Sequence, residues 1–236
     1  MDKSVDGVDK SLRAFTRESV LGVYAKQPLP GRVKTRLCPP LTPVEAAGLY
    51  DCALRETVAR LRAQQSFDLA LCYAGDPDWF AAVFPDLPLL PQRGEDLGAR
   101  MRDSFECLFR LGYRQVVLVG SDTPDLPLAL VEEAFACLQQ AEVVLAPARD
   151  GGYVLIGKTE SRPELFEAMR WSSPEVLPET LRRLELLGCR AALLPDWEDL
   201  DDLPALERLL RRSPQSRTAA YLCRQLAHHF SGGRQA

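Results

Sequence analysis

The alternation of short apolar segments with amphipathic helical segments constrains the fold of this chain more than any other feature. The strongest segment is QVVLVGSD (115–122), where four consecutive apolar residues, three of them valine, are typical of a strand covered on both faces. Further segments that read as strands are 19–25, 67–75, 88–92, 142–148, 152–158 and 189–195. Helical patterns occupy 42–61, 97–112, 128–140, 173–188, 202–212 and 214–229. This alternation predicts an α/β fold with a mainly parallel sheet and helices on both faces.

The first long helix has a clear start in the sequence. Thr42 is a favourable N-cap, Pro43 suits the first helical position, and Glu45 completes a capping box. Apolar residues then recur at helical spacing as far as Leu61. The pattern predicts a helix that begins at Pro43.

The length and charge of the chain favour one soluble domain. A chain of 236 residues is long enough to bury a large core. We expect residues 1–17 to form a flexible N-terminal tail and residues 18–230 to form a single domain. The formal net charge of −4 argues against a protein that binds nucleic acid, because such binding depends on lysine and arginine. No segment approaches the ~20 apolar residues of a membrane span, so we expect no membrane insertion.

The cysteines and the N-terminal residues bear on the cellular compartment in which we expect the protein. The seven cysteines are odd in number and contain no Cys-x-x-Cys pair, which argues against a disulfide framework or a structural zinc site. The opening residues MDKSVDGVDKSLRAF are polar and lack the apolar core of a signal peptide. We therefore expect a protein of the reducing cytoplasm.

A basic loop follows the first predicted strand, at the kind of position where open α/β sheets bind ligands. Its sequence, AKQPLPGRVKTRL (25–37), concentrates positive charge in an otherwise acidic protein. Lysine offers a phosphate a point charge, and arginine offers a bidentate fork. The residues that we expect at a phosphate chain are Lys26, Gly31, Arg32, Lys34, Thr35 and Arg36. The alternative is a solvated basic loop. The basic loop does not contain a Walker motif, because valine precedes Lys34 where that motif requires glycine.

Two aspartates follow the strongest predicted strand, in VGSDTPDLP (119–127). Asp122 emerges as the buried strand ends, and a carboxylate fixed there suits a hard cation such as Mg²⁺ or Mn²⁺ beside substrate phosphates. The alternative is that an aspartate caps the following helix. We expect Asp122 to bind the metal and Asp125 to be the cap.

An acidic segment, DWEDLDDLPAL (196–206), is the third candidate. Five acidic residues within seven positions repel one another unless a cation or a basic group lies nearby. The alternative is an acidic helix start that complements the helix dipole, and we expect Asp202 to play that part. Asp199 and Asp201 are the candidates for a second metal contact.

Two segments that contain glycine complete the candidates. RGEDLG (93–98), with Gly94, opens a predicted helix whose backbone N–H groups suit an anion or a base. RDGGY (149–153) joins two predicted strands, and its Gly151 and Gly152 indicate either close approach to a ligand or a simple turn.

The histidines argue against covalent catalysis. The chain contains only His228 and His229, both in the predicted C-terminal helix, so neither is expected to activate a serine or cysteine. Transfer of nucleotide groups depends mainly on positioning and on charge stabilisation by a metal and by lysine and arginine. The residue types of this chain suit that kind of catalysis.

Five motifs occur in an order that resembles a known family. They are VYAKQPLPGRVKTRL, QRGEDLGARM, VLVGSDTPDLP, APARDGGYVLIG and WEDLDDL. Together they resemble the bacterial GT-A-superfamily transferases of the radical-SAM/selenodomain-associated type, also named "putative nucleotide-diphospho-sugar transferase". More distantly, the chain is similar to 2-phospholactate guanylyltransferase and to the molybdenum-cofactor nucleotidyltransferases. The resemblance covers roughly residues 18–210.

This resemblance implies a three-layer, Rossmann-like GT-A fold, mostly parallel, with an antiparallel element in its second half. It implies that Gly31, Lys34 and Arg36 handle nucleotide phosphates and that Asp122 binds the metal. The Asp-x-Asp motif usual in glycosyltransferases is absent at this point, where the sequence is Ser-Asp-Thr-Pro.

The late acidic motif is also similar to one of that family. Asp199-Leu200-Asp201 resembles its Asp-Val-Asp, which supplies a second acidic contact to the metal. The chain then departs from the family, because Asp-Leu-Pro-Ala-Leu stands where Thr-Pro-Glu-Asp-Leu is usual. That departure leaves the start of the following helix open.

The activity that the resemblance implies is metal-dependent transfer of a glycosyl group from a nucleotide-diphospho-sugar to a small-molecule acceptor, with Asp150 as the acceptor-side base. The alternative is transfer of a nucleoside monophosphate from a nucleoside triphosphate to a phosphorylated acceptor, with release of pyrophosphate, and the basic loop favours it. A further alternative is a non-catalytic nucleotide-binding protein on the same fold. Both transfer reactions require the basic loop and Asp122 to converge on one cation-bound phosphate group.

Overall fold

The computed structural model describes residues 17–230. The tail expected at 1–17 lies outside the described residues except for Arg17, whose Nε is 3.6 Å from Oδ1 of Asp68. The division into a tail and one domain stays a prediction. None of the helices within 17–230 has the length and apolar character that a membrane crossing requires.

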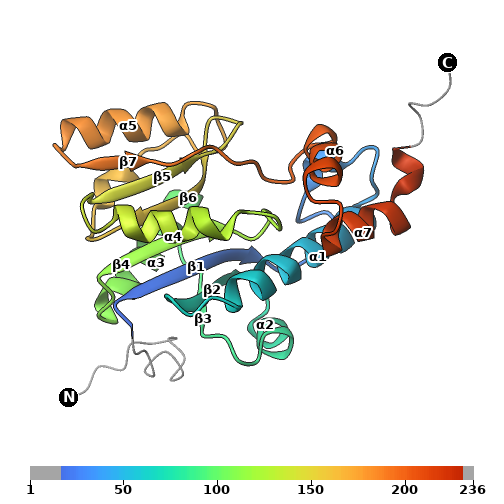
Figure 1. Ribbon diagram of the computed structural model, residues 1–236, viewed down its shortest axis with the longest axis horizontal. Coiled ribbons are helices and arrows are strands. Elements are labelled where there is room, and N and C mark those ends of the chain that lie inside the picture. Colours follow the sequence, from blue (N-terminus) through green and yellow to red (C-terminus); the bar gives the residue numbers. More distant parts are fainter. Residues whose placement is uncertain (1–16, 231–236) are drawn as a thin grey trace.

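The described residues contain one mixed sheet of seven strands, in the order β3-β2-β1-β4-β6-β5-β7 (Figure 1). The strands are β1 (Ser19–Lys26), β2 (Asp68–Ala74), β3 (Leu89–Pro91), β4 (Gln115–Gly120), β5 (Val143–Pro147), β6 (Tyr153–Lys158) and β7 (Ala191–Leu193). All neighbours are parallel except those of β6, which runs antiparallel to both β4 and β5. The mostly parallel sheet is confirmed, and β6 is the antiparallel element in its second half.

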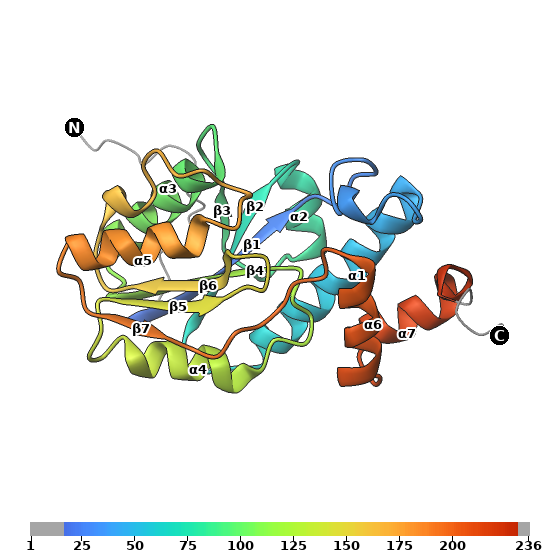
Figure 2. The same cartoon turned by 90° about the horizontal axis from the view of Figure 1, so that it is seen from above.

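Helices cover both faces of the sheet, as predicted (Figure 2). One face carries α1 (Pro43–Arg62), α2 (Pro77–Val83) and α4 (Leu128–Cys137), and the other carries α3 (Leu97–Arg110) and α5 (Val176–Leu186). Successive side chains of a strand point to opposite faces, so Val117 and Val119 of β4 pack with the first group, and Val116 and Leu118 pack with the second. This central strand is completely covered, which explains its run of apolar residues.

A third apolar cluster lies beyond the sheet, around the first half of α1. The C-terminal helices α6 (Leu203–Arg212) and α7 (Arg217–Gln225) pack there beside a short 3₁₀ helix, η2 (Thr35–Leu37), within the basic loop (Figure 1). Its fully buried leucines are Leu37, Leu206, Leu209, Leu222 and Leu226. The C-terminal helices therefore pack against the buried side of the basic loop.

Local signals in the sequence explain several element starts. The capping box of α1 is present, because Thr42 Oγ1 accepts the N–H of Glu45 and the Glu45 carboxylate accepts the N–H of Thr42. Asp202 caps α6 by accepting the N–H of Ala205, as expected. The sequence pattern does not predict α2, because seven residues are too few to display a helical period.

The cap predicted for α4 is wrong. The residue at the N-cap is Pro127, and no side chain accepts a hydrogen bond from the first turn. Asp125 instead accepts hydrogen bonds from Arg212, 87 residues later in the chain. A tertiary partner has replaced the local cap.

The strand order opens a crevice between β1 and β4. The chain runs from β1 to β2 and β3 on one side and then crosses to β4 on the other side of β1. Where the order reverses in this way, the loops that follow the two neighbouring strands leave a crevice between them at the carboxyl ends of the strands. This is where α/β proteins bind ligands. Tyr24 of β1 pairs with Gly120 of β4, so the basic loop and the loop with Asp122 leave the sheet side by side.

Candidate active site

Lys34 reaches into this crevice from a constrained backbone position. Its φ of 49° and ψ of 37° lie in the left-handed region, which is uncommon for a residue with a side chain. Leu37, three residues later, is fully buried and anchors the 3₁₀ turn that follows. The side chain of Lys34 is only 6 % exposed, so the turn delivers an ammonium group to a largely enclosed place.

The basic loop and Asp122 do converge. Lys34 Nζ donates to Oδ2 of Asp122 at 2.7 Å and to Oδ1 of Asp201 at 2.7 Å. Arg36 Nη1 donates to the other oxygen of Asp201 at 2.9 Å, and the Arg36 side chain is 57 % exposed. Residues from three distant parts of the sequence therefore meet at one point.

Three carboxylates gather around this lysine. One oxygen each from Asp122, Asp199 and Asp201 lies within 4.8 Å of the others, and all three residues are half-buried. We call Asp122, Asp199, Asp201, Lys34 and Arg36 the cleft cluster. It contains three acidic and two basic groups, so negative charge remains in excess.

The charges perturb one another in consistent directions. Burial raises the pKa of Asp199 to about 7, and repulsion from Asp122 and Asp201 adds to that effect. Burial acts to lower the pKa of Lys34, but Asp122 and Asp201 outweigh it and raise that pKa above its usual value. Burial acts to raise the pKa of Asp201, but Lys34 and Arg36 outweigh it and lower that pKa. An additional cation would relieve the repulsion on Asp199.

The spacing of Asp199 and Asp201 follows from the residue between them. Leu200 is 1 % exposed and belongs to the apolar cluster of the C-terminal helices. Its backbone N–H donates to the carbonyl oxygen of Asp122 at 3.1 Å. This bond fastens the late acidic loop to the loop after β4, with an aspartate on each side of the buried leucine.

The cleft beside these residues has a volume of about 640 Å³, which suits a nucleotide-sized ligand. Tyr50 supports its floor, because the Tyr50 hydroxyl accepts the N–H of Lys26 at 2.9 Å and lies 2.7 Å from Ser121 Oγ. Burial raises the pKa of Tyr50 to about 12. The hydroxyl thus stays protonated and holds the ends of β1 and β4 in place.

The other residues expected from the basic loop divide into two groups. Lys26, Arg32 and Thr35 line the cleft with Lys34. Gly31 lies in the preceding turn with a φ of 74° and does not line the cleft. Its predicted contact with phosphate has no support from its position.

The expected glycine contacts are not in the cleft either. Gly94 lies against the first turn of α3, where its carbonyl accepts from Arg100 Nε, and Asp96 caps that helix. A Cβ at Gly151 would lie 2.4 Å from the carbonyl oxygen of Pro174, so its close contact is with the backbone and not with a ligand. Gly152 belongs to the same turn, and its N–H donates to Asp150. Asp150 does not line the cleft, although it contributes to the raised pKa of Asp199.

Sequence reasoning missed several residues of the cleft. Trp171 lines it, and a Cβ at Gly98 would lie 2.5 Å from the indole, so only glycine permits this contact. Arg100, Gln92 and Tyr24 also line the cleft. Trp171 lies in an irregular loop outside the five motifs. Tyr24, Gln92 and Arg100 lie within those motifs, and Gln92 directly follows β3, but nothing in the sequence distinguished them from their neighbours there.

The fold is that of the nucleotidyltransferases and GT-A-like transferases. CMP:2-keto-3-deoxy-manno-octonic acid synthetase, solved with CTP, aligns with a TM-score of 0.55 at 12% identity and covers 84% of this chain and 99% of its own. Rv0371c of Mycobacterium tuberculosis H37Rv, solved with manganese, aligns with a TM-score of 0.50 at 17% identity and covers 81% of this chain and 98% of its own. At these identities the likeness establishes the fold alone.

A much nearer relative establishes the family. The "putative nucleotide-diphospho-sugar transferase" of Desulfovibrio desulfuricans G20 is 37% identical, with a TM-score of 0.83, over 90% of this chain and 96% of its own. The family described as "Uncharacterized protein conserved in bacteria (DUF2064)" matches residues 57–173. The chain belongs to this DUF2064 family. A comparison with curated proteins gave no match.

Proposed function

We propose that this protein is a metal-dependent nucleotidyltransferase that moves a nucleoside monophosphate from a nucleoside triphosphate to a small phosphorylated acceptor. The observation that carries the proposal is the meeting of Lys34 with Asp122 and Asp201 at the crevice between β1 and β4. A buried ammonium beside excess carboxylate suits a ligand that brings both negative phosphates and a divalent cation.

The donor set fits Mg²⁺ or Mn²⁺. Asp122, Asp199 and Asp201 offer oxygen ligands only, which hard divalent cations prefer, and their mutual repulsion favours a bound cation. These three residues would hold the ion. When bound, the ion would neutralise phosphate oxygens and favour in-line displacement at phosphorus.

The remaining chemistry needs little from the protein besides charge and orientation. An acceptor phosphate oxygen attacks the α-phosphorus, the bond from that phosphorus to the α–β bridging oxygen breaks, and the electron pair leaves with pyrophosphate. Lys34 lines the cleft, and positive charge on Lys34 and on the exposed, neighbouring Arg36 would offset the charge that grows on this leaving group. A phosphate acceptor is already anionic near neutral pH, so no histidine base is required.

Glycosyl transfer from a nucleotide-diphospho-sugar is the second candidate. The name of the 37% identical relative favours it. In this reaction the sugar–phosphate bond breaks, and the same cationic side chains would face a departing nucleoside diphosphate. The basic loop after β1 favours nucleotidyl transfer because a departing pyrophosphate carries more concentrated charge.

One assay separates these activities. The protein is incubated with Mg²⁺ or Mn²⁺, with each nucleoside triphosphate or nucleotide-sugar, and with a panel of phosphorylated small molecules. We expect pyrophosphate and a nucleotidylated product. Release of a nucleoside diphosphate with a glycosylated product would instead favour the second candidate. Metal-dependent binding with no product under any condition would leave a non-catalytic nucleotide-binding protein.

Variants test whether the cleft is responsible. Lys34→Ala should weaken triphosphate binding at least tenfold and leave nucleoside binding nearly unchanged. Asp86→Asn is the control for the substitutions of Asp122 and Asp199 described below. Asp86 lies in an exposed ion pair with Arg62 outside the cleft. Equal loss of nucleoside and triphosphate binding in Lys34→Ala would rule out a phosphate role for Lys34.

A further inference from the structure

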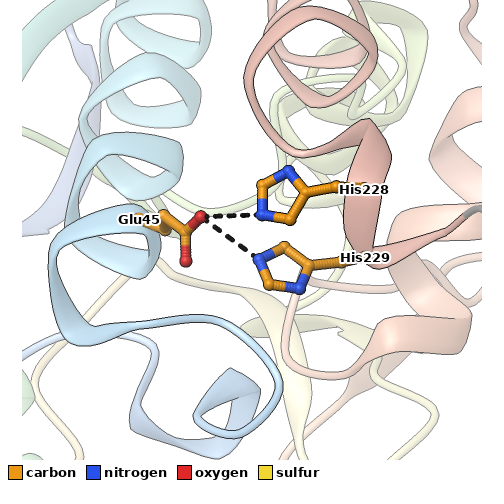
Figure 3. A group of neighbouring side chains, drawn as sticks. All are labelled: Glu45, His228 and His229. Atoms are coloured by element: carbon orange, nitrogen blue, oxygen red, sulfur yellow. Dashed lines mark hydrogen bonds and ion pairs between the residues drawn. The ribbon is translucent and has the colours of Figure 1, made fainter.

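Both histidines of the protein point at one carboxylate oxygen. His228 Nε2 and His229 Nε2 each lie 3.2 Å from Oε1 of Glu45, although Glu45 is 184 residues from His229 in sequence (Figure 3). The two imidazole rings are tilted by 42°, with centroids 3.9 Å apart. These three side chains, which we call the histidine cluster, lie at the start of α1 and in the 3₁₀ turn η4 (Ala227–His229).

The carboxylate of Glu45 is held in position by the capping box. Its second oxygen, Oε2, accepts from the backbone N–H of Thr42 at 2.7 Å and from Thr42 Oγ1 at 2.8 Å. The first oxygen is thereby aimed at the histidines. Hydrogen bonds that orient a ligating side chain in this way are typical of metal centres.

The geometry of the histidine cluster suits a tetrahedral ion. Its ligand atoms all lie within 4.8 Å of one another, and the distances to Glu45 are 3.2 Å. Ligand atoms at the usual zinc distances in a tetrahedron are separated by about 3.3 Å. The His229 side chain is 14 % exposed and that of His228 is 61 % exposed, so an ion can enter and keep a water ligand.

We propose that Glu45, His228 and His229 form a second metal site, distinct from the cleft cluster, that takes Zn²⁺ or a similar transition-metal ion. Two imidazoles and one carboxylate are the donors of zinc, cobalt and nickel centres, whereas Mg²⁺ prefers oxygen alone. The cleft cluster has only oxygen donors. The two sites therefore select different ions.

The ion would fasten the end of the described chain to the start of α1. The N-terminus of α7 is already tied to α1, because the buried Glu56 accepts from the N–H groups of Arg217 and Thr218. The histidine cluster ties the other end of the same segment, three turns earlier on α1. With both ends held, the C-terminal helices would support the basic loop more rigidly.

Zinc binding to the full chain tests the proposal. The protein is dialysed against Zn²⁺ in excess Mg²⁺, which occupies oxygen-only sites, and bound zinc is counted by mass spectrometry. We expect one tightly bound zinc per chain. His228→Gln, His229→Gln and Glu45→Gln should each weaken binding at least tenfold, and glutamine at position 45 retains the capping box. Cobalt should give a tetrahedral visible spectrum without a thiolate charge-transfer band.

Two controls separate this site from other ligands. Asp122→Asn should retain the zinc, which keeps the result independent of the proposed transferase function. Cys223→Ser should also retain it, because Cys223 is the exposed cysteine near the same end of the chain. The proposal is overturned if the histidine variants bind zinc as tightly as the wild type, if Asp122→Asn alone loses it, or if the cobalt spectrum shows thiolate ligation.

Discussion

The acids of two charged clusters come from the same two loops, but the clusters differ in how that acidic charge is balanced. Asp122 of the cleft cluster and Asp125 are three residues apart in the loop after β4. Asp199 of the cleft cluster and Glu198 are neighbours in the late acidic loop. Asp125 and Glu198 turn away from the cleft and bind arginines of α6. We call Asp125, Glu198, Arg208 and Arg212 the arginine cluster.

Every acid of the arginine cluster has a matched partner. Arg212 donates to both oxygens of Asp125, at 2.6 and 3.1 Å, and also to Glu198, while Arg208 Nε donates to Glu198 at 2.6 Å. The guanidinium of Arg212 lies 4.5 Å from the ring centroid of Trp197. Asp125 and Glu198 are each only 4 % exposed.

The contrast distinguishes acids whose charge is neutralised by arginines within the fold from acids whose charge remains in excess beside a cleft. In the arginine cluster two carboxylates meet two guanidinium groups, and the loops are locked together. In the cleft cluster the charge is unbalanced, Asp199 has a raised pKa, and all members except Arg36 line the cleft. Groups perturbed by both burial and like charge are concentrated at functional sites.

Replacement of Asp122, the first of the two aspartates after β4, should change nucleotide binding most. Asp122→Asn should weaken Mg²⁺-dependent nucleotide binding at least about 100-fold, because it removes a carboxylate that would hold the ion. Its midpoint of urea unfolding should stay near that of the wild type. Calorimetric titration with nucleotide and Mg²⁺ measures the first quantity. Nucleotide binding at wild-type strength would remove Asp122 from the metal site.

Arg212→Met should have the opposite signature. We expect the free energy of unfolding to fall by about 3 kcal/mol, because two buried carboxylates lose a partner. Nucleotide binding by the folded protein should change only a few-fold. Arg211→Met is the matched control, since Arg211 is 73 % exposed and forms only a surface pair with Glu207. Unchanged stability together with lost nucleotide binding would exchange the roles of the two clusters.

A third buried charge shows the effect of burial on a pKa where no excess of like charge surrounds the group. Lys158 of β6 is 1 % exposed, with Nζ 4.2 Å from the ring centroid of Phe105 and 4.7 Å from that of Phe166. Burial lowers its pKa to about 7, from an ordinary value of 10.5. The unfolded chain therefore binds more protons between these two values, and stability due to this group rises with pH across that window.

Replacement of this lysine should therefore stabilise the protein in a pH-dependent way. Lys158→Met should raise the free energy of unfolding by on the order of 2 kcal/mol below pH 7, and the gain should shrink towards pH 10. Denaturant unfolding at a series of pH values measures it, with the exposed Arg114→Met as control. A gain that does not depend on pH would mean that packing, and not charge, limits stability at this position.

The smallest expected effect concerns Asp199. Asp199→Asn should raise the stability of the metal-free protein by about 1 kcal/mol, because it relieves repulsion from Asp122 and Asp201. It should also weaken the binding of Mg²⁺. Thermal unfolding in a chelator measures the stability difference. A loss of stability would show that Asp199 supports the fold and belongs functionally with the arginine cluster.

The sequence was sufficient for the longer helices and most strands, and for where the strand ends meet. Apolar runs marked the strands, and strand ends in an open α/β sheet share an edge, so the convergence of the basic loop with Asp122 could be predicted. The resemblance to a GT-A family supplied the antiparallel strand, which appears as β6. Short elements such as α2 were lost because periodicity needs length.

The sequence was not sufficient to tell which acid serves which purpose. Asp122 and Asp125 sit in the same motif, and only the position of Arg212, 87 residues beyond Asp125, separates them. Glu198 and Asp199 are separated in the same way. Trp171 enters the cleft from an irregular loop with no periodic signal. Such assignments depend on tertiary contacts that local patterns do not encode.

The most direct test is a crystal structure of the protein with Mn²⁺ and a non-hydrolysable nucleoside triphosphate, with the metal located by anomalous scattering. We expect a manganese peak among Asp122, Asp199 and Asp201, with Lys34 in contact with a phosphate oxygen. A nucleotide bound elsewhere, or bound in this crevice with its phosphates turned away from these side chains, would contradict this expectation.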